Sequence, residues 1–198
     1  MIWRDGDVPA ELHNNPIPIG SGGNVFRFTD IAWDLVYEDP NDQRSKETFD
    51  SLHHLSLEYE WIVKYSGEYI GQLQLNQNQH VYRFAEAFLF KAEVENEKNN
   101  TLSAINYLNE IAERAYGVTD YYSSTLSGSE VNDIILKERC KELFFEGKHW
   151  WDLIRFDKLF EKVPTLIGRE NELNVMLWPV NYNTINKNNK ITQTPGYD

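Results

Sequence analysis

The amino-acid sequence predicts an all-α fold of two antiparallel helical hairpins, flanked by an irregular N-terminal arm and an extended C-terminal tail. Three observations predict it. From Gln79 onward, apolar residues recur at the three- and four-residue spacing of a helix. Polar or glycine-containing breaks separate the apolar stripes, and no helical period is found before residue 79. We therefore expect an irregular, loop-rich region over 1–78 and a helical region over 79–198, both within one domain.

The arm is rich in residues that interrupt regular structure. It has prolines at positions 9, 16, 18 and 40 and the glycine run GSGGN. This run lacks the GK[ST] ending of a phosphate-binding loop, and no helix follows it. The short stretches VFRF and WIVKY have the β-branched and aromatic content of strands. We expect loops and short strands that depend on the helical region for their stability.

Two apolar stripes predict the first hairpin. They comprise Val81, Phe84, Ala85, Phe88, Leu89 and Ala92, and then Leu102, Ile105, Leu108, Ala112 and Ala115. The polar run NEKNN separates them. We expect Thr101 to cap the second helix and Gly117 to end it. Two such helices joined by a short polar link form an antiparallel hairpin.

The second hairpin follows the linker GVTDYYSSTLSGS. Ser129 is the expected N-cap, with Glu130 in the first turn. The inward-facing residues are predicted to be Val131, Ile135, Leu143 and Phe144. Gly147 breaks this helix, and a second amphipathic segment runs from Trp150 to about Phe160. The proline-containing remainder has no helical period and predicts an extended tail laid over the bundle.

Composition excludes several classes of protein. The 198 residues carry a formal net charge of −12, which repels phosphate backbones, so we expect no nucleic-acid partner. The single cysteine, Cys140, excludes an internal disulfide framework. No run approaches the roughly 20 apolar residues of a membrane helix. The first residues lack the basic and apolar regions of a signal peptide, so we expect neither a signal peptide nor a lipid anchor in this chain.

The stretch KERCKELFFEGKHWWDLIRF joins the helices of the second hairpin and allows several chemical interpretations. Glu146 and His149 have the spacing of a carboxylate-bridged di-metal site, but Gly147 interrupts the pair, and we expect no metal. Cys140 lies mid-helix without a histidine at helical spacing, so we interpret it as a small core residue. The 31 acidic residues single out no acid/base pair, and we expect no catalytic residue and no cofactor.

The alternative for this stretch is a structural role. The apolar side chains expected inside the fold are Phe145, Trp150 and Leu153. Glu142 or Glu146 is expected to pair with an arginine. Glu86 and Glu93 flank the apolar stripe of their helix on the same side, where they can pair with arginines such as Arg139 or Arg155.

The longer stretch LKERCKELFFEGKHWWDLIRF resembles the C-terminal signature of the SusD/RagB family, outer-membrane nutrient-binding lipoproteins of Bacteroidetes. That signature runs roughly E-R-R-x-E-L-x-F-E-G-x-R-W-x-D-L-x-R. His149 and Cys140 stand where the pattern usually has arginine. The matching residues are Glu138, Arg139, Glu142, Leu143, Phe145, Glu146, Gly147, Trp150, Asp152, Leu153 and Arg155.

Further blocks agree with the same family in the same order. VYRFAEAFLFKAEVEN is similar to its aromatic helix, and NDQRSKETF to the acidic-arginine turn before it. LWPV and QTPGYD resemble its closing proline strand and terminal N-P-G-Y, with Thr194 in place of asparagine. The resemblance spans about Asp39 to Asp198. It implies a SusD-like C-terminal helical domain over 79–198, with TPR-like repeats in an α/α superhelix. Because the family is typically far longer, we expect this chain to be a C-terminal portion.

The resemblance also implies a function. It predicts a non-catalytic binder on the outer-membrane surface that captures oligosaccharide or another nutrient and passes it to a TonB-dependent, SusC-like transporter. Sugars stack on exposed aromatic rings, and the aromatic residues outside the helical stripes are Trp3, Trp33, Tyr37 and Trp61. Each is equally compatible with packing. The alternatives are a helical-hairpin module that binds a protein partner through its acidic face, and a helical glycoside hydrolase, which needs a carboxylate pair in a cleft.

Overall fold

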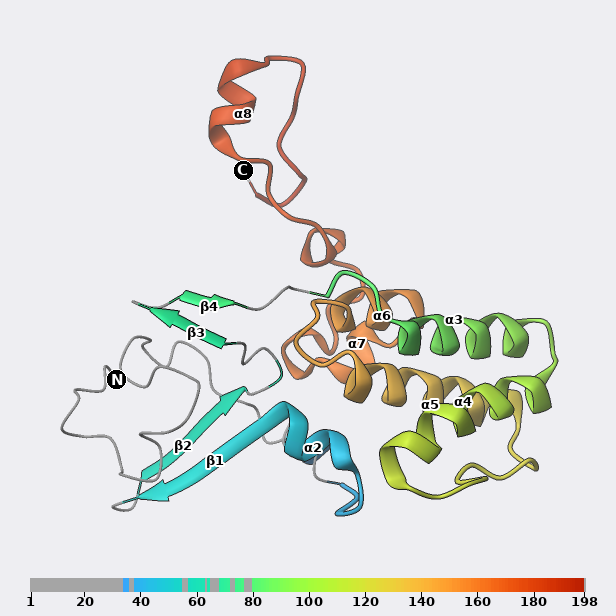
Figure 1. Ribbon diagram of the computed structural model, residues 1–198. Helices are drawn as coiled ribbons and strands as arrows, with labels where there is room; N and C mark the ends of the chain where they lie inside the picture. Colours follow the sequence, from blue (N-terminus) through green and yellow to red (C-terminus); the bar gives the residue numbers. More distant parts are fainter. Residues whose placement is uncertain are drawn as a thin grey trace. The chain divides into compact units, whose positions relative to one another are not determined.

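The structure is a computed structural model (Figure 1). It describes residues 34–35, 38–54, 57–62, 64, 68–71, 74–76 and 80–197. The chain divides into two compact units, residues 1–149 and 150–198, which are described separately. The boundary predicted near residue 79 lies inside the first unit and stays a prediction.

Two short β-hairpins follow α2 (Gln43–Thr48) in the first unit. β1 (Phe49–His54) pairs antiparallel with β2 (Leu57–Ile62). β3 (Glu68–Gly71) pairs antiparallel with β4 (Gln74–Asn76). β2 overlaps the predicted strand WIVKY by its first two residues only, and Lys64 of that stretch lies in a turn, so the strand begins and ends earlier than predicted. The other predicted strand, VFRF, lies outside the described residues.

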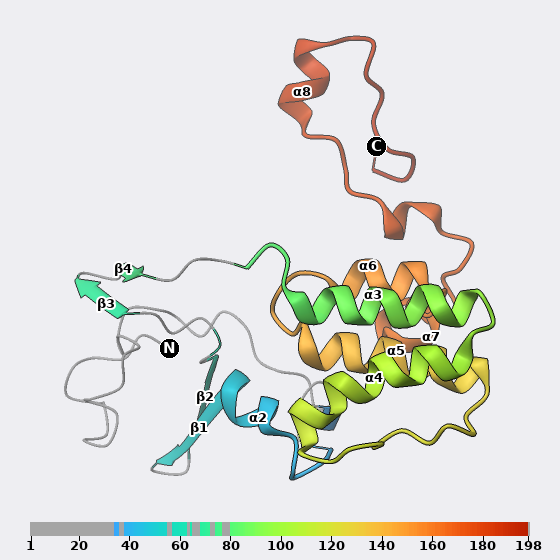
Figure 2. The ribbon, with the colours of Figure 1, turned by 45° about the vertical axis from the view of Figure 1, so that its right-hand side comes forward.

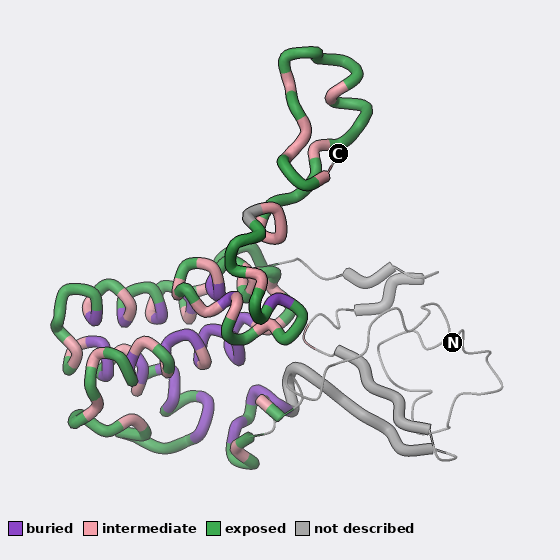
Figure 3. Tube along the Cα trace, turned by 180° about the vertical axis from the view of Figure 1, so that it is seen from behind, coloured by how far each residue is buried: buried purple, intermediate pink, exposed green. Residues whose placement is uncertain are grey.

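The predicted first hairpin is formed by α3 (Phe84–Glu97) and α4 (Thr101–Tyr116). Figures 1 and 2 show these two helices side by side with α5 (Gly128–Glu142). Their buried apolar residues include Leu89, Ala92, Ile105, Leu108, Ala112, Ala115, Val131 and Ile135. Figure 3 shows the buried residues concentrated along the inner sides of these helices. Short helices are marginal alone, so this shared core stabilises all three.

The beginnings of both predicted stripes are exposed, contrary to prediction. The side chains concerned are those of Val81, Phe84 and Leu102. Val81 precedes the first helical residue of α3. Phe84 and Leu102 lie in the first turns of their helices and are rotated away from the buried face, as follows from about 100° of rotation per residue.

The helix ends confirm one predicted cap and correct two. Gly117 ends α4 with a left-handed φ of 71°, as predicted. Thr101 is the first residue of α4 and not its cap. Ser127, not Ser129, caps α5: its side chain accepts a hydrogen bond from the Glu130 backbone N–H, and Glu130 Oε2 accepts one from the Ser127 N–H at 2.8 Å. The Ser-x-x-Glu spacing makes this reciprocal capping box possible.

The glycine corner after α5 is confirmed, but one side chain in it is not where we predicted. α5 ends at Glu142, and Phe145 and Gly147 have left-handed φ angles of 62° and 71°. Phe145 is 42% exposed, contrary to prediction, because the left-handed turn takes it out of the helical stripe. Cys140 is buried in α5, as expected for a small core residue.

The second unit contains short helices. They are α6 (His149–Arg155, which begins one residue before the unit), α7 (Leu159–Lys162), the 3-10 helices η3 (Pro164–Leu166) and η4 (Leu173–Met176), and α8 (Tyr182–Lys187). Asp157, with a φ of 55°, separates α6 from α7, where we predicted one continuous segment. Leu153 is buried as predicted, and Trp150 is half-buried.

The tail is less extended than predicted. It contains α8, whose start is stabilised by the Asn181 side chain accepting the Asn183 backbone N–H at 2.9 Å. In the part of the chain that the structure describes, no helix is both long and apolar enough to span a membrane.

Replacing Gly117 by alanine should lower the free energy of unfolding by about 1 kcal/mol, because an L-residue is strained at a left-handed φ. A Cβ at Gly117 meets nothing within 4 Å, so the cost comes from the backbone alone. Urea unfolding followed by circular dichroism measures it.

The matched control is Gly128→Ala, in the first turn of α5. Its Cβ would lie 3.5 Å from atoms of Asn96 and Thr101, which is ordinary contact, so stability should be unchanged or slightly raised. Equal unfolding curves for Gly117→Ala and the parent protein would contradict the assignment of Gly117 as the helix end.

Candidate functional site

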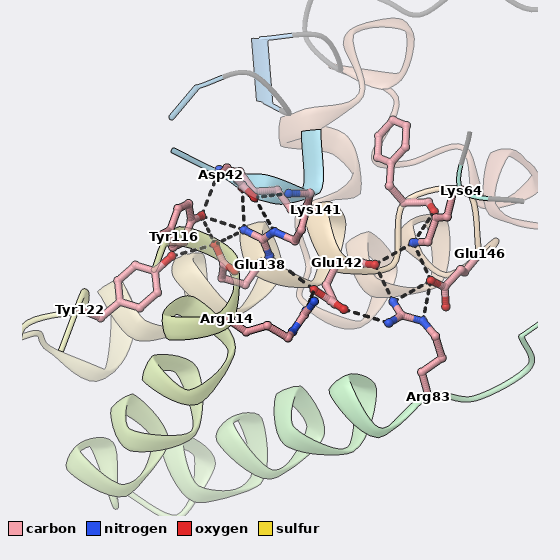
Figure 4. A network of polar contacts seen from close by, with 12 residues as sticks. Asp42, Lys64, Arg83, Arg114, Tyr116, Tyr122, Glu138, Lys141, Glu142 and Glu146 are labelled. Atoms are coloured by element: carbon pink, nitrogen blue, oxygen red, sulfur yellow. Dashed lines mark hydrogen bonds and ion pairs between the residues drawn. The ribbon is translucent and has the colours of Figure 1, made fainter. Parts of the chain in front are cut away.

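Three glutamates four residues apart form the centre of a buried polar network in the first unit (Figure 4). Glu138 and Glu142 lie on one face of α5, and Glu146 lies in the corner that follows. We call these three residues the glutamate ladder. Their side chains are 0%, 3% and 0% exposed. Carboxylates this deeply buried remain charged only if cations or hydrogen-bond donors surround them.

Glu138 is held by Arg44 of α2 and by two tyrosines. Arg44 Nη1 donates to Glu138 Oε2 at 2.8 Å. The hydroxyls of Tyr116 and Tyr122 both donate to Glu138 Oε1, at 2.7 and 2.8 Å. Arg44 is oriented in turn by Asp42, whose two oxygens accept from Nε and Nη2 at 2.8 and 2.7 Å. The contact therefore fixes α2 against the ends of α4 and α5.

Glu142 is shared among three arginines. Arg83, just before α3, donates from Nη1 to Glu142 Oε1 at 2.9 Å. Arg114 of α4 donates to the other oxygen, Oε2. Arg44 Nη1 lies 3.6 Å from the same oxygen, so it links the contacts of Glu142 to those of Glu138.

Glu146 and the end of α5 are held by Arg83 and Lys64. Arg83 Nε donates to Glu146 Oε1 at 2.9 Å, and Lys64 Nζ lies 2.7 Å from the same oxygen. Lys64 also donates to the backbone carbonyls of Glu142 and Phe144 at 2.8 and 3.0 Å. These are carbonyls that the end of a helix leaves without an internal partner. A lysine from the segment between β2 and β3 thus caps α5.

Two further ion-pair groups flank the ladder. Arg139, 2% exposed, has its Nη2 3.6 Å from Glu86 Oε1, which confirms the predicted pairing of Glu86 with Arg139. Lys141 Nζ lies 3.2 Å from Glu38 Oε2 and 3.6 Å from Asp42 Oδ2. These contacts tie the chain just before α2 to α5.

The surroundings shift several pKa values. Burial raises the pKa of the Glu142 carboxyl, but Arg114, Arg83 and Arg44 outweigh it and hold the pKa below its ordinary value of 4.5. The pKa of Glu146 is likewise lowered, because Arg83 and Lys64 outweigh its burial. Both carboxylates are therefore charged at neutral pH.

The pKa values of Lys64 and of two tyrosines are shifted as well. Burial lowers the pKa of Lys64, and the attraction of Glu146 only partly offsets this. Burial and the charge of Glu138 raise the pKa values of Tyr116 and Tyr122. Neutral tyrosine hydroxyls and charged carboxylates paired with arginine and lysine are suited to holding structure. Proton transfer near pH 7 instead needs a group with a pKa close to 7.

The structure places the predicted signature residues in two groups. Glu138, Arg139, Glu142 and Glu146 belong to the network of the first unit, and Gly147 forms the corner. The prediction that Glu142 or Glu146 pairs with an arginine is confirmed for both.

The remaining signature residues lie beyond the corner. Asp152 and Arg155 pair within α6 at 2.9 Å. Phe145 and Trp150 are the exposed and half-buried aromatic residues described above.

The predicted sugar-stacking residues are not brought together by the described structure. Trp3, Trp33 and Tyr37 lie outside the described residues. Trp61 lies in β2, and its side chain is likewise outside the described part. All four remain predictions.

Sequence reasoning missed most partners of the ladder. Arg44 lies in NDQRSKETF, which family resemblance singled out without assigning it a role. Lys64, Arg83 and Arg114 lie 78, 59 and 28 residues from Glu142 in the chain and have no local pattern that distinguishes them from surface cations.

Replacing Glu142 by glutamine should lower the free energy of unfolding by about 3 kcal/mol at pH 7, because three arginines lose a shared buried counter-charge. The change should also flatten the acid limb of the stability curve. Since the folded pKa of Glu142 lies below the unfolded value, its contribution is complete above pH 4.5 and is lost as pH falls through the folded pKa. Urea unfolding between pH 7 and pH 3 measures both effects.

Glu161→Gln is the control, because Glu161 forms only exposed pairs with Lys158 and Lys162. Its unfolding curves should match those of the parent protein at pH 7. If Glu142→Gln also matched the parent, the ladder would not be a significant source of stability.

Comparison with known proteins identifies the family. Residues 34–197 match the model of the SusD family. The chain is 31% identical over 143 residues to SusD-like protein P38 of Formosa agariphila, covering 69% of this chain and 28% of that protein. It is 35% identical over 92 residues to SusD-like protein P25 of the same organism, covering 46% of this chain and 18% of that protein. The chain thus spans less than a third of either relative.

Solved structures show the same fold. A SusD superfamily protein of Bacteroides vulgatus superimposes with a TM-score of 0.69 at 17% identity, over 85% of this chain and 44% of that one. A SusD homologue of Bacteroides thetaiotaomicron gives a TM-score of 0.67 at 27% identity, over 83% and 37%. These likenesses confirm the predicted all-α, TPR-like fold class. The chain therefore belongs to the SusD family.

Proposed function

We propose that this protein is a non-catalytic nutrient-binding component of an uptake system at the surface of the outer membrane. Its ligand is an oligosaccharide, which it passes to a TonB-dependent, SusC-like transporter. The observation that carries the proposal is family membership over residues 34–197. Because the chain spans only part of its relatives, ligand, transporter and location are proposed for the protein to which this chain belongs.

The contacts next to two proposed stacking residues support the ligand assignment. Tyr37 directly precedes Glu38 and Asp39 in the chain, and Trp33 lies four residues before Tyr37. Glu38 Oε1 lies 2.6 Å from Lys137 Nζ, and Asp39 Oδ2 accepts from the Tyr121 hydroxyl at 2.9 Å. Both contacts are exposed, so they favour one position of the chain next to Tyr37 without fixing it.

The charge pattern supports binding without catalysis. Glycoside hydrolysis needs one carboxylic acid with a raised pKa opposite a free carboxylate. Glu142 and Glu146 have lowered pKa values and arginine partners, which is the opposite arrangement. We propose that the bound ligand leaves unchanged.

The test is glycan-array binding followed by affinity electrophoresis in gels that contain the retained polysaccharide. The parent protein should be retained, and Trp33→Ala and Tyr37→Ala should each weaken retention several-fold through lost stacking. Trp151→Ala is the matched control, because Trp151 is an exposed tryptophan elsewhere in the chain and should leave retention unchanged.

Two results would contradict the proposal. Absence of glycan retention together with stoichiometric binding of a soluble protein would favour a helical interaction module. Release of reducing sugar by the purified protein, lost when a carboxylate is replaced, would instead show a hydrolase.

A further inference from the structure

The second unit contains a hollow that has no part in the glutamate ladder. Its volume is about 290 Å³, and it is lined by Trp150, Val175, Met176, Leu177, Trp178, Pro179 and Tyr197. Ligand pockets commonly have volumes of roughly 300 to 1,000 Å³, so this one is sized for a single ring and not for a long chain. None of the seven lining residues is charged, which favours a neutral ligand.

The rim of the hollow exposes an unusually large aromatic surface. Trp178 is 79% exposed, although tryptophan is on average a largely buried residue. Leu177, its neighbour on the rim, is also exposed. A flat indole face open to solvent beside a hollow is the surface on which the apolar face of a sugar ring stacks.

The walls of the hollow are held in place by hydrogen bonds within the unit. The Tyr197 hydroxyl lies 3.2 and 3.0 Å from the carbonyl oxygens of Asn174 and Leu177. The Thr194 hydroxyl donates to the Trp178 carbonyl at 2.9 Å. Such bracing keeps the hollow formed before a ligand arrives and lowers the entropic cost of binding.

One residue that lines the hollow, Trp150, has a polar atom without a partner. Trp150 Nε1 is buried and has no hydrogen-bond partner among the described residues. A buried donor without an acceptor is unfavourable. A ligand that supplied the acceptor would remove this cost, and the new hydrogen bond would favour the complex. The nitrogen exposes almost no surface, so a ligand oxygen reaches it only when the side chains around it shift on binding.

We propose that this hollow is a subsite for one neutral hexopyranose unit, with the ring stacked on Trp178 and a hydroxyl oxygen accepting from Trp150 Nε1. A pyranose combines the required features: a flat apolar face, no charge and several acceptor oxygens. The inference rests on the proposed function, since it adds a subsite for the same class of ligand.

Saturation-transfer NMR and isothermal titration with the methyl glycosides of glucose, galactose and mannose test the subsite on the full chain. We expect one of them to bind the parent protein, and Trp178→Ala to weaken it roughly tenfold through lost stacking. Trp150→Phe keeps an aromatic ring but removes the N–H, and should weaken binding about three- to tenfold. Trp151→Ala is the control that should bind like the parent, because Trp151 is exposed but does not line the hollow.

The outcomes separate this inference from the proposed function. If glycan retention depends on Trp33 and Tyr37 while Trp178→Ala and Trp150→Phe bind as tightly as the parent, the subsite is overturned and the proposed function stands. If the parent binds neither glycans nor methyl glycosides, both fail.

Binding of benzyl alcohol in place of every glycoside would assign the hollow to apolar ligands and overturn the sugar assignment. Circular dichroism melts that match the parent establish that the variants fold.

Discussion

The first unit depends on the burial of the carboxylates of Glu138, Glu142 and Glu146. A carboxylate withdrawn from water stays charged only when cations and donors replace the lost hydration. The replacements come from five separate places in the chain, namely α2, the segment after β2, the residue before α3, the C-terminal half of α4 and the linker that follows it. Every one of these segments must therefore meet α5 in a single arrangement.

The network selects an arrangement, whereas the apolar core supplies most of the stability. Buried ion pairs roughly break even against apolar replacements of the same shape, so their clearest effect is to penalise arrangements that leave a charge unpaired. The core of α3, α4 and α5 alone would tolerate small shifts of one helix along another. Arg83, which donates to Glu142 and Glu146 at once, and Lys64, which caps α5, permit few such shifts.

The sequence allowed the helices to be predicted better than the contacts. Apolar spacing located α3, α4 and α5, and left-handed glycines marked the end of α4 at Gly117 and the corner after α5 at Gly147. Single-residue assignments failed where two neighbours offered similar chemistry, as with Ser127 and Ser129, or where a turn redirected a side chain, as with Phe145. The partners of the ladder could not be predicted, because Lys64 acquires its role only when distant segments meet. The hollow of the second unit likewise combines three separate parts of the chain, namely Trp150, residues 175–179 and Tyr197.

A double-mutant cycle between Arg44 and Glu138 tests most directly whether the ladder holds the fold together. Arg44→Met, Glu138→Gln and the double variant would be unfolded in urea alongside the parent protein. Because the 2.8 Å contact joins two buried groups from distant segments, we expect a coupling energy of about 2 kcal/mol or more. Additive losses, agreeing within about 0.5 kcal/mol, would show that the two residues act independently and would contradict the account.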